Sequence, residues 1–117
     1  MKFLSLEPFV PSGSDFEASK QLFLELGFRI NWEVDGYAGF QADECRFILQ
    51  KYDVKEFADN FMLSIKVSDV EAFRQSVLDK KLIEKYDIRI SKIMQQPYGR
   101  EFNVIDIAGV CWHFVEQ

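Results

Sequence analysis

A five-residue pattern that occurs twice constrains the fold of this chain more than any other feature. Residues 14–18 read Ser-Asp-Phe-Glu-Ala, and residues 68–72, 54 residues later, read Ser-Asp-Val-Glu-Ala. Each copy has the Ser-x-x-Glu spacing of a capping box, so Ser14 and Ser68 are the expected helix N-caps. Each also follows an extended apolar stretch and opens an amphipathic one. We therefore expect two related halves, although two unrelated helices can share a cap by chance.

The spacing of apolar residues predicts which segments form helices and which form strands. Apolar residues at a period near 3.6 predict helices over residues 15–26 and 69–81, and Gly27 supplies the left-handed residue that ends the first. Asp35-Gly36 indicates a tight hairpin turn. Alternating polar and apolar residues predict the strands 28–34, 37–42, 45–51, 61–67, 88–94, 100–105 and 110–115.

With the extended stretch before Ser14 as the first strand of module one, the element order is β-α-β-β-β written twice. Module one covers residues 1–52 and module two covers residues 61–117, within one domain of residues 1–117. The polar residues 52–60 connect the modules and have room for one helical turn.

Net charge and cysteine content restrict the expected partners and cellular location of the protein. The formal net charge of -5 disfavours phosphate backbones and anionic membranes, so neither nucleic acid nor membrane is an expected partner. Cys45 and Cys111 have no CxxC spacing, which favours two reduced thiols in a cytoplasmic protein. The apolar stretch at residues 3–6 is too short for a signal peptide.

The C-terminal third carries the most specific motif. Asp106 and Gly109 suit a tight hairpin, because Asp bonds to backbone N–H groups and Gly adopts positive φ. Residues 96–102 (Gln-Pro-Tyr-Gly-Arg-Glu-Phe) and 106–114 (Asp-Ile-Ala-Gly-Val-Cys-Trp-His-Phe) resemble a signature of bleomycin-resistance-like members of the vicinal oxygen chelate superfamily, which also contains glyoxalase I and extradiol dioxygenases. The family signature has Trp at Tyr98, Pro at Ile107 and Asn at Val110.

This resemblance implies an α+β fold, and it covers nearly the whole chain. Two βαβββ modules would form a curved, cup-shaped mixed sheet with one helix outside each module. Members commonly pair modules across two chains, with clefts near the interface. We therefore expect a homodimer, which would also cover exposed strand edges.

Metal-dependent members of the superfamily hold their ion with His or Glu from the first strand of each module and from a late strand. Here the first-strand positions fall on Pro8 and Met62, which cannot bind such a metal, and the late position falls on His113, the sole histidine. One imidazole is not a site, because these metals need three or four converging ligands. We expect no metal and no cofactor.

Other catalytic patterns are absent or weak. The chain has no G-x-S-x-G, H-E-x-x-H, P-loop or dinucleotide fingerprint. Cys111 and His113 lie two apart on one strand, which is typical of a nucleophile beside its base. A buried small thiol beside a hydrogen-bonded histidine is the simpler interpretation. Catalysis is left open, with a non-enzymatic role favoured.

Bleomycin-resistance-like proteins sequester a drug without altering it. The resemblance therefore implies a metal-free protein that binds a planar or cationic small molecule, such as a bleomycin-type antibiotic, in an aromatic-lined groove. The alternatives are a metal-dependent lyase or dioxygenase and a catalytically silent dimerisation module.

Strand parity indicates which residues would line the groove. If Trp112 and Phe114 face the helices, then Cys111 and His113 face the cup. Aromatic residues at strand ends and turns would form its rim, although core packing is the competing interpretation for Trp32 and Phe61. The candidate ligand-binding residues are Trp32, Tyr37, Phe61, Tyr98, Glu101, Asn103, Cys111 and His113.

Overall fold

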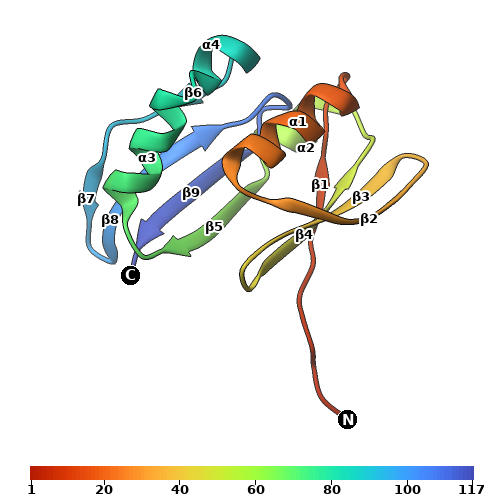
Figure 1. Cartoon of the computed structure of the whole chain (residues 1–117), viewed down its shortest axis with the longest axis horizontal. Helices are drawn as coiled ribbons and strands as arrows, with labels where there is room; N and C mark the ends of the chain where they lie inside the picture. Colours follow the sequence, from red (N-terminus) through yellow and green to blue (C-terminus); the bar gives the residue numbers. More distant parts are fainter.

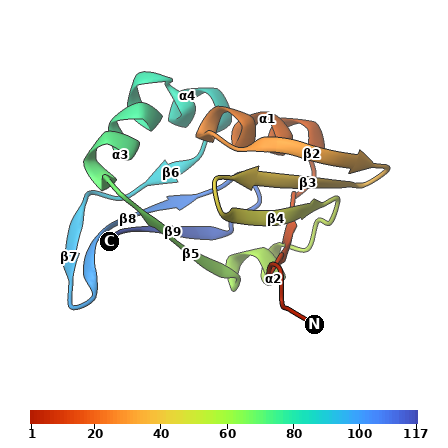
Figure 2. The same cartoon turned by 60° about the horizontal axis from the view of Figure 1, so that its bottom comes forward.

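The computed structural model describes residues 1–117 and contains two β-sheets with the two longer helices packed on one side of them (Figures 1 and 2). The first sheet has the strand order β1-β4-β3-β2, and the second has the order β5-β9-β8-β6, with β7 paired to β8. In both, the first strand of the module lies parallel to its last strand. The α+β architecture of two βαβββ modules is confirmed.

The elements have the following bounds. Module one contains β1 (Phe9–Pro11), α1 (Phe16–Leu26), β2 (Arg29–Val34), β3 (Tyr37–Ala42) and β4 (Cys45–Gln50). The connector forms α2 (Lys55–Asp59). Module two contains β5 (Met62–Val67), α3 (Val70–Asp79), α4 (Leu82–Tyr86), β6 (Arg89–Ile90), β7 (Met94–Gln96), β8 (Gly99–Ile105) and β9 (Cys111–Glu116). No helix has the length and apolar run that a membrane crossing requires.

A single hydrophobic core joins the two modules. The ring of Phe23 in α1 contacts Phe47 in the first sheet and Trp112 in the second, with ring centroids 4.9 Å and 5.3 Å apart. Nineteen buried residues from both modules form this cluster. Burial of large aromatic side chains is the main stabilising contribution, because each removes a large apolar area from water.

The two helix caps differ from the prediction. The N-caps are Asp15 and Asp69, not Ser14 and Ser68, and each Asp carboxylate accepts a hydrogen bond from the backbone N–H three residues later, at 3.0 Å and 2.9 Å. A carboxylate also interacts favourably with the positive end of the helix dipole, which explains why Asp displaces Ser as the cap.

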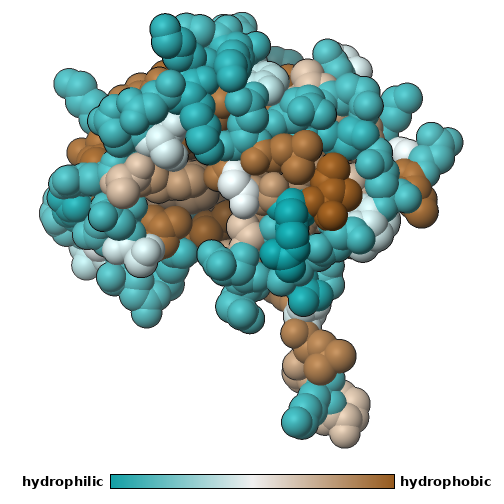
Figure 3. Space-filling view, viewed as in Figure 1, coloured by the Kyte–Doolittle hydropathy of each residue, from teal (hydrophilic) through white to brown (hydrophobic).

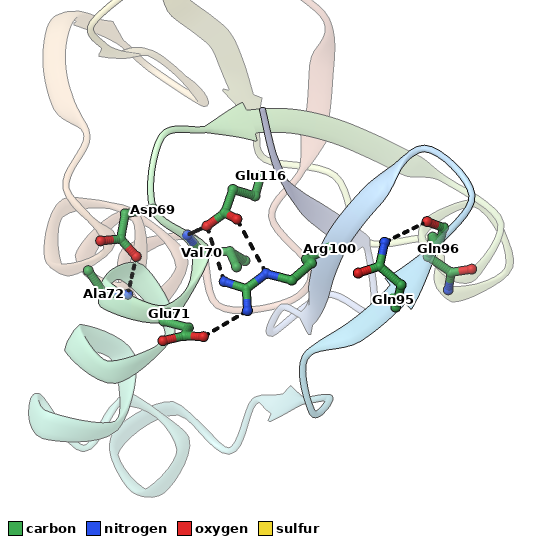
Figure 4. Close-up of polar contacts among 8 residues, drawn as sticks. All are labelled: Asp69, Val70, Glu71, Ala72, Gln95, Gln96, Arg100 and Glu116. Carbon is green, nitrogen blue, oxygen red and sulfur yellow. Dashed lines mark hydrogen bonds and ion pairs between the residues drawn. The ribbon is translucent and has the colours of Figure 1, made fainter.

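The second glutamate of the repeat has a different role from the predicted capping box. Glu71 accepts a hydrogen bond from Arg100 at 2.8 Å, and Arg100 also contacts Glu116 (Figure 4). Glu116 in turn accepts from the backbone N–H of Val70 at 3.1 Å. The arginine of the C-terminal motif therefore ties the start of α3 to β8 and β9.

Three further predictions need correction. The single cup-shaped sheet is two sheets, because β1 and β5, the first strands of the two modules, are unpaired at their outer edges. The strand at 88–94 is split, because the Ser91 hydroxyl accepts the N–H of Asn103 and the chain leaves the ladder until Met94. The extra helix α4 begins after Lys81, whose φ is 58° in a chain position that offers no glycine signal.

Candidate functional site

The face of the second sheet opposite the helices carries most of the predicted site residues. Phe102, Val104, Trp112 and Phe114 are buried on the helix side, as parity predicts. The alternate residues of β8 and β9 therefore point to the open face. We call four of them, together with Tyr98 and Met62, which contact Glu101 and His113, the polar wall, and it consists of Met62, Tyr98, Glu101, Asn103, Cys111 and His113.

A buried carboxylate organises the polar wall. Glu101 is 1% exposed, and its Oε2 lies 2.8 Å from Nδ1 of His113, whereas its Oε1 accepts a hydrogen bond from the hydroxyl of Tyr98. Burial acts to raise the pKa of Glu101, but the hydrogen bonds from Tyr98 and His113 outweigh it and lower this pKa below its usual value. Glu101 is thus an ionised group behind His113, so we reassign it from direct ligand contact to holding the imidazole.

Asn103 supplies a further donor to the same carboxylate. With the amide assigned so that both of its ends are satisfied, its nitrogen lies 2.7 Å from Oε2 of Glu101. A charged acceptor surrounded by donors is a low-energy arrangement in a buried site. An ionised carboxylate can only accept, so the 2.8 Å contact between Oε2 of Glu101 and Nδ1 of His113 assigns a proton to Nδ1.

The other ring nitrogen of His113 faces the open side between two sulfur atoms. Nε2 lies 3.5 Å from Sγ of Cys111 and 3.4 Å from Sδ of Met62. Burial, with the nearby negative charges of Glu101 and Asp106, raises the pKa of the Cys111 thiol. Cys111 is therefore a protonated thiol beside an imidazole nitrogen.

The turn between β8 and β9 fixes the position of these side chains. One oxygen of Asp106 accepts the backbone N–H groups of Ala108, Gly109 and Val110 at 3.0–3.1 Å, and the other accepts the indole N–H of Trp112 at 2.8 Å. Burial raises the pKa of Asp106 to about 6, although these donors oppose the shift. Gly109 has φ 109°, so the predicted roles of Asp106 and Gly109 are both confirmed.

The open face of the first sheet carries aromatic side chains instead. A register shift between Ile30 and Trp32 pairs Trp32 with Gly39. Ala38 and Phe40 on either side of Gly39 are buried, so Gly39 lies at an open-face position of β3. The indole lies where a side chain at Gly39 would be, since a Cβ at this position would overlap Nε1 of Trp32. Trp32 is 41% exposed, so it lies on the open face and not in the core.

Tyr37 and Phe9 complete this surface. Their rings meet edge to face, with centroids 6.2 Å apart. Tyr37 has the parity of Gly39, and Phe9 pairs with Ile48 on the adjoining strand. We call Phe9, Trp32 and Tyr37 the aromatic wall. Phe9 was not among the predicted residues, because residues 9–11 are all apolar and show no alternation that separates the two faces of β1.

Phe61 belongs to neither wall. It packs against the hydrophobic core and stacks on Phe57 of α2, with centroids 5.4 Å apart and an interplanar angle of 19°. The structure therefore joins Tyr98, Glu101, Asn103, Cys111 and His113 in one contact network and places Trp32, Tyr37 and Phe61 outside it.

The residues present do not fit the transition metal of the metal-dependent members. Pro8 contributes its backbone carbonyl to Ile48, and Met62 contributes a thioether next to His113. No group of three or more His, Cys, Asp or Glu side chains is placed to hold a metal ion. The chemistry of this donor set is therefore that of a hydrogen-bonding surface.

A hollow with a volume of about 710 Å³ lies between the modules on the helix side. Figure 3 shows apolar side chains within a depression near the middle of this face. Its lining comes from the end of α1, the β3–β4 turn, β5 and α3, and includes Phe28, Ile65 and Phe73. None of the predicted site residues lines it.

Comparison with solved structures gives the same fold throughout. A bleomycin-binding protein from Streptomyces verticillus, complexed with copper(II)-bleomycin, is 25% identical with a TM-score of 0.82, covering 100% of this chain and 98% of that one. An antibiotic-binding protein from a Streptomyces strain is 17% identical with a TM-score of 0.78, at 99% and 98% coverage. A fosfomycin resistance protein from Listeria monocytogenes, complexed with Mn(II) and sulfate, is 8% identical with a TM-score of 0.76, at 99% and 91% coverage. No family model and no curated protein sequence matches the chain.

Proposed function

Because the chain has the fold of the vicinal oxygen chelate superfamily, we propose that it is a metal-free, cytoplasmic protein that binds a planar small molecule and sequesters it. The observation that carries this proposal is the pair of unlike surfaces on the open faces of the two sheets. The aromatic wall offers stacking area, and the polar wall offers one oriented imidazole. Ligand sites typically combine apolar surface with a few fixed polar groups.

The similarity to bleomycin-binding and antibiotic-binding proteins supports the choice of ligand class. A net charge of -5 attracts cationic ligands at long range. The exposed indole of Trp32 and the partly exposed phenol of Tyr37 also attract a cation over their faces, and stack on planar rings. A planar, cationic antibiotic of the bleomycin type is therefore the first ligand to test.

We infer that the protein acts as a homodimer. Residues 1–7 extend away from the body of the molecule (Figure 1), and Phe3, Leu4 and Leu6 are 89–95% exposed. Large apolar side chains exposed together on a monomer mark a protein interface. A second copy would cover this arm and the free edges of β1 and β5, and would bring the aromatic wall of one chain opposite the polar wall of the other.

Titration calorimetry with metal-free bleomycin tests the binding proposal. We expect saturable binding that Trp32→Ala weakens at least about tenfold, in line with the loss of an aromatic anchor. Leu24→Ala is the matched control, because Leu24 is exposed on α1 on the other side of the sheet. Absence of heat with bleomycin and with other planar cationic antibiotics would exclude this ligand class.

Light scattering tests the dimer separately. The wild-type chain should have the mass of two copies, and replacing Phe3, Leu4 and Leu6 by Ser should give the mass of one. A monomeric wild-type protein at high micromolar concentration contradicts the dimer but leaves ligand binding to be measured on its own.

A further inference from the structure

On the polar wall, the imidazole of His113 lies between the thiol of Cys111 and the carboxylate of Glu101. Sγ of Cys111 lies 3.5 Å from Nε2 of His113, and Nδ1 of the same ring lies 2.8 Å from Oε2 of Glu101. This is the order of a nucleophile, its general base and the group that orients the base. The sequence alone suggested only the first pair.

The orientation of the imidazole favours proton transfer from the thiol. Glu101 is buried and ionised, and it is held by Tyr98 and Asn103 as well, so the proton of the ring remains on Nδ1. Nε2 is then the unprotonated ring nitrogen, with Sγ of Cys111 at 3.5 Å and Sδ of Met62 at 3.4 Å. The side chain of His113 is 24% exposed, and Cys111 is partly exposed, so a ligand on the open face can reach both.

We propose that Cys111 captures ligands covalently by conjugate addition, with His113 as its base, and that the ligand class includes planar α,β-unsaturated carbonyl compounds. This inference rests on the proposed function, because the aromatic wall supplies the reversible binding that precedes reaction. It adds a chemical requirement on the ligand, an electron-poor carbon–carbon double bond.

The reaction balances without any further reactant. The proton of Cys111 passes to Nε2 of His113 as the sulfur electron pair forms a bond to the β-carbon of the enone. The electrons of the carbon–carbon double bond move to the carbonyl oxygen, which gives an enolate. The enolate then takes the proton from Nε2 at its α-carbon, so no leaving group departs and nothing is oxidised.

Activation by a base matters here because the thiol is not acidic by itself. The pKa of Cys111 lies above its usual value, so little thiolate is present at neutral pH. Cys45 provides an internal comparison, since it is also a partly exposed free thiol but has no imidazole beside it. Reaction at Cys111 in preference to Cys45 therefore reports the effect of His113.

The experiment uses chalcone, a planar enone, and dihydrochalcone, its saturated analogue. We expect wild-type protein with chalcone to gain the mass of one adduct, mapped by peptide mass spectrometry to Cys111 and not to Cys45. His113→Ala should slow this reaction at least about tenfold, since general-base catalysis contributes about 10²–10⁴-fold. Added imidazole should restore part of the rate, which it would not do if His113 were only structural.

Glu101 is tested as a positioning residue. Glu101→Gln should lower the limiting rate of adduct formation, while the chalcone concentration that gives half of that rate stays unchanged. An equal rate at Cys111 and Cys45 in the wild-type protein, or a His113→Ala variant that reacts as fast as wild type, would overturn the proposal. Binding of dihydrochalcone without any chalcone adduct would refute covalent capture and leave the proposed function intact.

Discussion

The open faces of the two modules carry different kinds of side chain, aromatic in module one and polar in module two, although the modules share one topology. The aromatic wall of module one consists of three aromatic side chains and is shaped by one missing side chain, because the indole of Trp32 occupies the space beside Gly39. The polar wall of module two is a continuous hydrogen-bonded network around the buried Glu101. A repeated scaffold thus provides one surface for stacking and one for directed polar contacts.

The difference has consequences for stability. Removing an aromatic ring from the aromatic wall loses only the apolar area that the ring buries, which is small at a partly exposed site. Removing a buried acceptor leaves several donors without partners, and each of those carries its own desolvation penalty. We therefore expect module two to be the more sensitive to single substitutions, and the four predictions below test this in order of decreasing effect.

The largest loss should follow Asp106→Ala. Three backbone N–H groups and the indole N–H of Trp112 would lose their acceptor, so we expect the free energy of unfolding to fall by about 3–5 kcal/mol. Urea unfolding gives this value. Asp15→Ala, which removes one exposed helix cap in module one, is the matched control and should cost only about 1 kcal/mol. Equal losses would mean that module two is no more sensitive than module one.

Glu101→Gln should have the next largest effect, and the effect should depend on pH. At neutral pH we expect a loss of about 2 kcal/mol, because a charged acceptor with several donors becomes a neutral amide. The pKa of Glu101 is lowered in the folded protein, so its stabilisation is present above the usual carboxylate pKa and disappears as the pH falls through the lower, folded value.

The difference between wild type and Glu101→Gln should consequently shrink on acidification. Urea midpoints at pH 7 and at pH 3 measure it on both proteins. A difference that stays constant over this range would show that Glu101 is not the ionised centre of the polar wall.

Gly39→Ala should perturb module one by about 1–2 kcal/mol, because the new methyl group forces the indole of Trp32 to move. The test is a double-mutant cycle, in which the same substitution in a Trp32→Ala background should cost much less. Additive losses would mean that the backbone at Gly39, and not the indole above it, is what requires glycine.

The regular parts of this site were predictable from sequence, and the irregular parts were not. Strand alternation placed Cys111 and His113 correctly, because Asp106 and Gly109 fix the β8–β9 turn and leave the register of the hairpin unbroken. Sequence reasoning left Trp32 between the rim of the groove and the core, and the register shift between Ile30 and Trp32 is what places it on the open face. A bulge has no clear signature in a strand of alternating residues.

The burial of a side chain on the open face could not be predicted from the sequence either. Parity assigns Glu101 to the open face, yet it cannot show that Tyr98 and His113 cover the carboxylate. The caps show a related limit, since Ser-Asp offers two adjacent capping residues and the Ser-x-x-Glu spacing does not reveal that Asp15 and Asp69 are the caps.

The smallest effect should come from Tyr98→Phe, which removes one donor from Glu101 and leaves the ring in place. Tyr98 is 62% exposed, so its hydrogen bond competes with water and stability at neutral pH should scarcely change. The pKa of Glu101 should rise toward its usual value, because a bond that favours the ionised form is lost. Acid unfolding followed by circular dichroism should therefore begin at a higher pH than in wild type, whereas Tyr37→Phe in the aromatic wall should leave it unchanged. An unshifted acid transition in Tyr98→Phe would show that His113 and Asn103 suffice to keep the Glu101 carboxylate ionised.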